Sequence, residues 1–287
     1  MVPCLFVSDL HGRINRYEGL FRSILKDEPA GVFLGGDLFP SGFGALLAGE
    51  SDYQDFLADF LVPRLEDLKS TMGPGYPEVF LILGNDDPRI EEEVVLDIAD
   101  RGLWHYVHDR EIPFHGFRVF GYSYVPPTPF RLKDWERYDV SRYTPHGSVS
   151  PEEGVRTVSV STHEARYSTI KEDLENLAGT GSLDTAVFLF HTPPHETSLD
   201  RAALDGKSID YVPLDLHVGS IAVRRFIETR QPLMTLHGHI HESTRLTGSW
   251  KDHLGRTHLF SAAHDGPELA LVRIDLECPD RATRDLI

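Results

Sequence analysis

The chain has 287 residues, of which 40% are hydrophobic and 25% charged, and its 28 basic and 45 acidic residues give a formal net charge of −17. This composition is ordinary for a globular protein, and no apolar run is long enough to span a bilayer. The acidic excess, with no cluster of Lys and Arg, disfavours nucleic acids and anionic membranes as partners. Met1 leads directly into a strand-like segment without a secretory signal, so we expect a cytoplasmic protein.

The N-terminal part of the chain alternates short apolar runs with segments of helical periodicity. Apolar runs bounded by turn residues indicate buried strands, and apolar side chains three and four residues apart indicate amphipathic helices. The predicted strands are 3–7, 31–34 and 78–83, and the predicted helices are 13–26, 52–68 and 91–100. This alternation favours parallel strands in an α/β fold, in which functional side chains gather where the strands end.

The remainder of the chain is less regular. A strand at 117–122 is followed by a proline-rich segment that forces an extended path. The polar segment around 131–163 is interpreted as an insertion that could close over a site as a lid or mediate homo-oligomer formation. The further predicted elements are helices at 164–177 and 220–229 and strands at 185–190, 233–236, 257–261 and 268–276. We expect residues 1–287 to form a single domain that includes this insertion.

Polar side chains follow five of the predicted strands at the points where the strands end. They are Asp9, His11, Asp37, Asn85, His191, His239 and His241. Carboxylate, imidazole and amide ligands suit Mn, Fe, Zn and similar cations, and a set without sulfur is unlike a structural cysteine–zinc site. The two cysteines, Cys4 and Cys278, lie near opposite ends of the chain and are interpreted as reduced thiols without a catalytic role.

The order of these residues along the chain is similar to that of a known protein family. The series Asp-x-His, Gly-Asp, Gly-Asn, a lone His after a strand and Gly-His-x-His resembles the calcineurin-like metallophosphoesterase superfamily. Each motif is weak alone, but five in this order, from Asp9 to His241, form a specific pattern. The resemblance implies an α/β fold, a four-layer α-β-β-α sandwich of two mixed β-sheets flanked by helices. Shorter stretches, such as Pro127 to Phe130 and His217 to Ser220, are similar to the group related to the cyclic-nucleotide phosphodiesterase branch.

The resemblance also implies a site and a reaction. The first of two divalent ions would be held by Asp9, His11 and His241, the second by Asn85, His191 and His239, and Asp37 would bridge them. Mn²⁺ is the expected metal, with Fe, Zn, Co and Ni as alternatives. The implied activity is hydrolysis of a small or nucleotide-like phosphoric ester, with a hydroxide that bridges the metals as the nucleophile.

One position departs from the family pattern. The family usually has Gly-Asn-His followed by an acidic residue, where the histidine contacts phosphate, but this chain has Gly84-Asn85-Asp86-Asp87. An ionised Asp86 would repel an anionic substrate, so we hypothesise a preference for phosphodiesters, which carry less negative charge than monoesters. Asp86 is therefore a candidate catalytic residue.

A second candidate and several alternatives stay open at this stage. His195 follows two prolines and could replace the absent histidine as a proton donor, or it could be an exposed loop residue. The alternative functions are a non-catalytic interaction module on the same fold and a phosphomonoesterase. A nuclease is disfavoured by the acidic charge balance. Every matched ligand position holds a side chain that can bind a metal ion, which favours an enzyme over a non-catalytic module.

Overall fold

The computed structural model describes residues 1–40 and 55–287. Most of the strands belong to two sheets. The strands of the first sheet are β1 (Pro3–Val7), β2 (Gly31–Gly35), β3 (Glu78–Ile82), β4 (His105–Tyr106), β13 (Ala270–Asp275) and β14 (Thr283–Leu286). The strands of the second are β5 (Arg110–Phe114), β6 (Phe117–Tyr122), β7 (Ala186–Phe190), β10 (Met234–His237), β11 (Lys251–Leu254) and β12 (Thr257–Ser261). A separate short hairpin joins β8 (Ser208–Ile209) to β9 (Val212–Pro213).

Both large sheets are mixed. The first is six-stranded with the order β14-β13-β1-β2-β3-β4, and the second is six-stranded with the order β11-β12-β10-β7-β6-β5. Strands β1 to β4 are parallel neighbours, and β13 pairs with β1 antiparallel. In the second sheet β12, β10, β7 and β6 are parallel, with antiparallel β11 and β5 at the edges. The ends of the parallel strands therefore bring their following loops together at one edge of each sheet.

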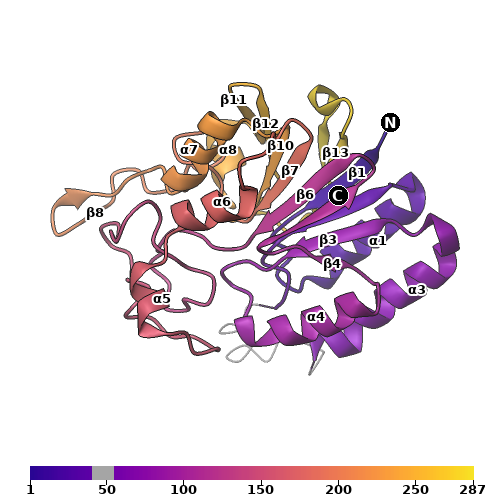
Figure 1. The fold of residues 1–287 in the computed structure, drawn as a ribbon, viewed down its shortest axis with the longest axis horizontal. Coiled ribbons are helices and arrows are strands. Elements are labelled where there is room, and N and C mark those ends of the chain that lie inside the picture. Colours follow the sequence, from indigo (N-terminus) through magenta and orange to yellow (C-terminus); the bar gives the residue numbers. More distant parts are fainter. Residues whose placement is uncertain (41–54) are drawn as a thin grey trace.

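Helices cover the outer faces of the two sheets (Figure 1). The first sheet is covered by α1 (Ile14–Asp27), α3 (Val62–Met72) and α4 (Glu92–Asp100), and the second by α6 (Ile170–Ala178) and α7 (Ile221–Arg230). The remaining helices are the π-helical turn η1 (Leu57–Leu61), which leads into α3, the 3₁₀ turns η2 (Gly73–Gly75), η3 (Arg89–Glu91) and η4 (Pro279–Arg281), and the short helices α5 (Thr162–Tyr167) and α8 (Ser243–Thr247). In the part of the chain that the structure describes, no helix combines the length and apolar character needed to cross a membrane.

Alternating side chains of the strands build two kinds of core. On β1, Cys4 and Phe6 lie between the two sheets and pack with Leu189 of β7. Leu5 and Val7 of the same strand belong to the core beneath the helices. Strands buried on both faces read as continuous apolar runs, as these do. The expected four-layer sandwich of two mixed sheets flanked by helices is thus confirmed.

Two predicted helices differ from the observed ones. The predicted helix 52–68 begins outside the described residues, and its described part is η1 followed by α3. The predicted helix 164–177 is two helices, α5 and α6. The break occurs because the side chain of Thr169 accepts a hydrogen bond from the Glu172 N–H and so caps a new helix.

The segment 131–163 has little regular structure but is anchored to the body of the protein. Trp135 is fully buried and its ring packs against His108 and Tyr124. Lys133 and Glu136 form an ion pair whose two side chains are completely buried. Tyr124 and Trp135 are therefore packing residues of this anchor.

His108, within this anchor, should make stability depend on pH. Burial, and then the positive charges of Arg137, Arg89 and Arg110, lower the pKa of His108 to about 3. The native ring is neutral, and its Nδ1 accepts a hydrogen bond of 3.0 Å from the Ser123 N–H. The unfolded chain therefore binds more protons below pH ~6.5, and stability falls as the pH falls from there toward 3.

We expect His108 to contribute about 2 kcal/mol of the stability lost between pH 7.5 and pH 5. Urea unfolding at both pH values measures this loss. His108→Asn keeps an acceptor near the Nδ1 position, although we expect the variant to be less stable at both pH values. The free energy of unfolding that it loses between pH 7.5 and pH 5 should be about 2 kcal/mol smaller than the loss in the wild type. An equal pH dependence in the two proteins would show that His108 is not the cause.

Candidate metal centre

The loops that follow β1, β2 and β10 hold residues in an unusual backbone conformation. Asp9, His11, Asp37 and His239 have φ angles of 56°, 47°, 52° and 72°. Side chains other than glycine rarely adopt this left-handed region, which costs on the order of 1–3 kcal/mol per residue. Four of the eleven non-glycine residues with positive φ in the described part of the chain are candidate ligands, so a share of this backbone strain lies at the candidate site.

Two glycines allow these loops to approach one another. A Cβ atom at Gly84 would collide with the Asp37 side chain and with Cε1 of His191. A Cβ atom at Gly238 would collide with the side chains of Ser8 and Asp9. Any larger residue at these two positions would force the candidate ligands apart.

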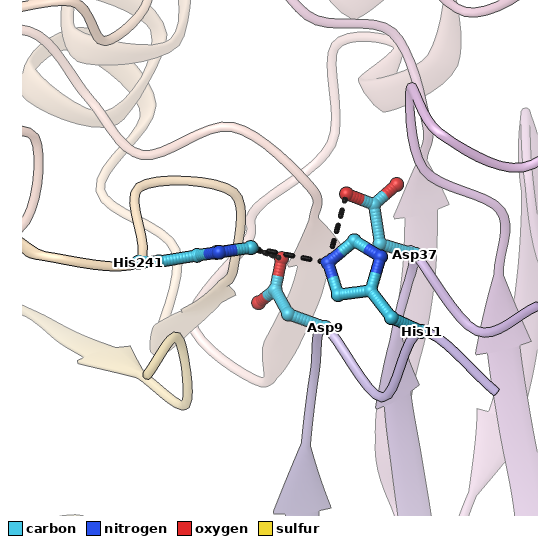
Figure 2. A group of neighbouring side chains, drawn as sticks. All are labelled: Asp9, His11, Asp37 and His241. Atoms are coloured by element: carbon cyan, nitrogen blue, oxygen red, sulfur yellow. Dashed lines mark hydrogen bonds and ion pairs between the residues drawn. The ribbon is translucent and has the colours of Figure 1, made fainter. Parts of the chain in front are cut away.

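Four of the candidate ligands converge on one point (Figure 2). His241 Nε2 lies 3.2 Å from Asp9 Oδ1 and 3.2 Å from His11 Nε2. His11 Nε2 lies 3.8 Å from Asp37 Oδ2. One ligand atom from each of Asp9, His11, Asp37 and His241 lies within 4.8 Å of all the others. The spacing is suitable for a single cation.

A second group shares Asp37 with the first. Its members Asp37, His191 and His239 also place ligand atoms within 4.8 Å of one another. His191 Nε2 lies 3.3 Å from Asp37 Oδ2 and 3.1 Å from Asn85 Oδ1. His191 Nδ1 lies 2.8 Å from the Gly35 carbonyl oxygen, so Nδ1–H donates to that carbonyl and Nε2 offers its lone pair to the site. All seven residues predicted as ligands are thus brought together.

A buried oxygen without a partner supports a metal ion here. Asp9 is completely buried, and its Oδ2 atom makes no hydrogen bond with the described residues. Burying a carboxylate oxygen without a partner is costly. A divalent cation among Asp9, His11, Asp37 and His241 would supply the missing contact, so the donor set fits the expected metal.

Charge pairs link the side chains of the site. Burial acts to raise the pKa of Asp9, but the hydrogen bond and charge of His241 outweigh it and lower the pKa to about 2. Burial acts to lower the pKa of His191, but the charge of Asp37 and the hydrogen bond with it raise the pKa to about 9. A cation would replace the proton on His191, so metal binding at neutral pH should release protons.

Asp86, predicted to face the substrate, lies against the first ligand group. Its Oδ2 atom is 3.2 Å from His11 Nδ1, the ring nitrogen on the far side from His241. Its backbone N–H donates to Asp37 Oδ1 at 2.8 Å. The side chain is 35% exposed, so Asp86 is also accessible at the edge of the site.

From its place in the sequence, Asp87 could cap the helix that follows Pro88, which is the favoured interpretation, or orient a neighbouring ligand. The structure agrees with the second alternative, because the completely buried carboxylate accepts hydrogen bonds from the N–H groups of Leu38, Phe39 and Gly84. It therefore ties the loop carrying Asp37 to the loop carrying Asn85. Burial and the charge of Asp37 raise the pKa of Asp87 to about 7.

The other histidines near the motifs lie outside both ligand groups. His195 Nε2 is 3.4 Å from Asp215 Oδ2, and its ring packs against His217. His237 is completely buried, with its ring nitrogens 2.9 Å from the Thr192 carbonyl oxygen and 2.7 Å from Thr235 Oγ1. His237 is a packing residue, and a catalytic role for His195 remains a prediction.

A comparison with protein families places this arrangement in context. The family model described as calcineurin-like phosphoesterase matches residues 2–243, which include all seven candidate ligands. The chain belongs to the calcineurin-like phosphoesterase family. This membership indicates a metal-dependent phosphoester hydrolase with a site of the dinuclear type, in agreement with the two groups that share Asp37.

Comparison with solved structures supports the fold. One crystal structure aligns at 16% identity over 99% of this chain and 98% of its own, with a TM-score of 0.59. The protein TT1561 of Thermus thermophilus aligns at 15% identity over 99% of this chain and 98% of its own, with a TM-score of 0.51. A dimetal phosphatase from Danio rerio aligns at 13% identity over 94% and 91%, with a TM-score of 0.48. The first two of these structures, at such low identities, show the fold alone. A search of curated proteins gave no match.

Proposed function

We propose that this chain hydrolyses phosphodiesters of small or nucleotide-like compounds with the help of two divalent metal ions. The observation that carries the proposal is the pair of ligand groups that share Asp37, beside the unpartnered buried Oδ2 of Asp9. Two such ions, when bound, neutralise charge on a phosphoryl oxygen and lower the pKa of a water molecule. The nearer resemblance, to the cyclic-nucleotide phosphodiesterase branch, is consistent with this substrate class.

The residues of the chain position and tune this site. Asp9, His11 and His241 would hold the first ion, and Asn85, His191 and His239 the second, with Asp37 between them. Strained loops and close glycine contacts fix these side chains in advance, so little reorganisation is needed when a substrate arrives. The Gly35 carbonyl fixes the ring of His191 through Nδ1.

Asp86 favours the diester through charge. A phosphomonoester carries a charge of about −1.5 to −2 at pH 7, whereas a diester carries about one negative charge. The partly exposed carboxylate of Asp86, within contact distance of His11, would repel the monoester more strongly. The same contact with His11 Nδ1 orients the ring, so Asp86 also supports metal binding.

The proposal predicts faster turnover of a diester than of a monoester. Metal-stripped protein is assayed with bis-p-nitrophenyl phosphate and p-nitrophenyl phosphate while Mn²⁺ is added back in steps. We expect Mn²⁺-dependent hydrolysis that is faster on the diester. Asp86→His should raise the monoester rate relative to the diester rate.

The outcomes separate the alternatives. Metal-dependent turnover that is faster on the monoester would agree with the metal site but contradict the proposed role of Asp86. An unchanged ratio of monoester to diester rates in Asp86→His would contradict that role as well. Folded protein without turnover in any divalent metal would favour the non-catalytic interaction module. His195→Ala tests the proton donor, because loss of that role should slow substrates with poor leaving groups more than nitrophenyl esters.

A further inference from the structure

A second cluster of potential metal ligands lies away from the candidate metal centre. It contains His253 of β11, His258 of β12 and Asp280 of η4. His258 pairs with Met234, the first residue of β10, whereas the last residue of β10 leads into the candidate metal centre. The cluster therefore lies at the opposite end of these strands from the candidate metal centre.

The hairpin β11–β12 holds the two histidines together. His253 and His258 are directly opposite each other in the antiparallel pairing, separated by a short turn that contains Gly255. Directly opposite residues project from the same face of a strand pair with their Cβ atoms close together. The two imidazoles are consequently aligned by the register of the hairpin.

The three side chains direct ligand atoms to a common point. His253 Nε2 lies 2.9 Å from His258 Nδ1, and Asp280 Oδ1 lies 3.6 Å from the same nitrogen. All three ligand atoms lie within 4.8 Å of one another. In a tetrahedral zinc site the Zn–N distance is 2.0–2.1 Å, which places two nitrogen ligands about 3.3 Å apart. The 2.9 Å between His253 Nε2 and His258 Nδ1 is close to that separation.

A single shared proton cannot link all three ligand atoms at once. If His258 Nδ1 carries a proton, it can be donated fully to only one of the two neighbouring acceptors. If the proton is on His253 Nε2 instead, the lone pair of His258 Nδ1 faces the Asp280 carboxylate. A cation at the centre would accept lone pairs from all three atoms at once.

We propose that His253, His258 and Asp280 form a second, separate binding site for a divalent transition metal ion, with Zn²⁺ as the best match. Two imidazoles and a carboxylate are a ligand set that Zn²⁺ accepts, with water in the fourth position. Because η4 follows β13 of the first sheet, the ion joins that sheet to the edge hairpin of the second. Its role is to stabilise the fold, since an ion that binds only the native state raises stability.

The test uses the full chain, stripped of metal, with Zn²⁺ alone as the probe. The number of Zn²⁺ ions bound per chain and the melting temperature are measured for the wild type, His253→Asn and Asp280→Asn. We expect each variant to bind one Zn²⁺ fewer than the wild type and to show a smaller rise in melting temperature. The matched control is His115→Asn, which removes a histidine near a single carboxylate, Glu78, and should behave as the wild type.

Equal Zn²⁺ stoichiometry and equal thermal shifts in the wild type and Asp280→Asn would overturn the proposal. The Asp280 side chain is 82% exposed, so this variant is expected to fold whatever its effect on Zn²⁺. The test needs no substrate. It therefore stands even if the chain proves not to hydrolyse phosphoesters.

Discussion

Asp37→Asn should reduce metal-dependent phosphodiester hydrolysis by at least about 10³-fold and weaken metal binding by both ligand groups. Asp37 is the one residue shared by the two groups, with Oδ2 3.8 Å from His11 Nε2 and 3.3 Å from His191 Nε2. An amide keeps the shape of the side chain but removes the negative charge that offsets repulsion between two cations. Hydrolysis and the number of bound Mn²⁺ ions, measured on the same preparation, check this result.

A titration of the metal-free protein measures the effect of the Asp37 charge separately from its role as a metal ligand. The charge of Asp37 and its hydrogen bond are what raise the pKa of His191 to about 9 against the effect of burial. In Asp37→Asn without metal, NMR titration should show a His191 pKa well below that of the wild type. The control is Asp184→Asn, which removes an exposed carboxylate that pairs with Arg256 and should alter neither activity nor the titration. Full activity of Asp37→Asn would contradict the shared role of Asp37.

The sequence was most informative where an apolar strand runs into polar residues. The predicted strand 117–122 is the observed β6, and β1, β2, β3, β7 and β10 begin and end within one residue of their predicted bounds. In each of these strands a buried apolar run stops at a turn, and that local signal is strong. Because parallel strands end at a common edge, the ends of β1, β2, β3, β7 and β10 also bring the seven candidate ligands together.

What the sequence could not indicate depends on contacts between distant residues. The edge strands β11 and β14 are mostly polar and gain their structure from pairing with β12 and β13. Asp86 follows Asn85 directly, but its contact with His11 depends on how two loops meet. The cluster of His253, His258 and Asp280 likewise requires the hairpin and η4 to be adjacent in space.

The second large effect is expected at Asp87. Asp87→Ala would leave three buried N–H groups, of Leu38, Phe39 and Gly84, without their acceptor. Each unsatisfied buried group costs about 1–3 kcal/mol, so the free energy of unfolding should fall by at least about 3 kcal/mol. Mn²⁺ affinity should fall as well, because Asp37 precedes Leu38 and Asn85 follows Gly84. Urea unfolding and Mn²⁺ titration, both at a temperature where the variant is folded, measure these two losses.

A comparison with Asp200 distinguishes positioning of the site from simple stabilisation. Asp200 is also completely buried, and its carboxylate accepts hydrogen bonds from the N–H groups of Glu196, Thr197 and Gly219. Those groups belong to the connection between β7 and α7 and include no residue of either ligand group. Asp200→Ala should therefore lose a similar amount of stability while its Mn²⁺ affinity stays near that of the wild type. If the two variants lose Mn²⁺ affinity equally, the loss reflects general destabilisation, and Asp87 does not position the metal ligands.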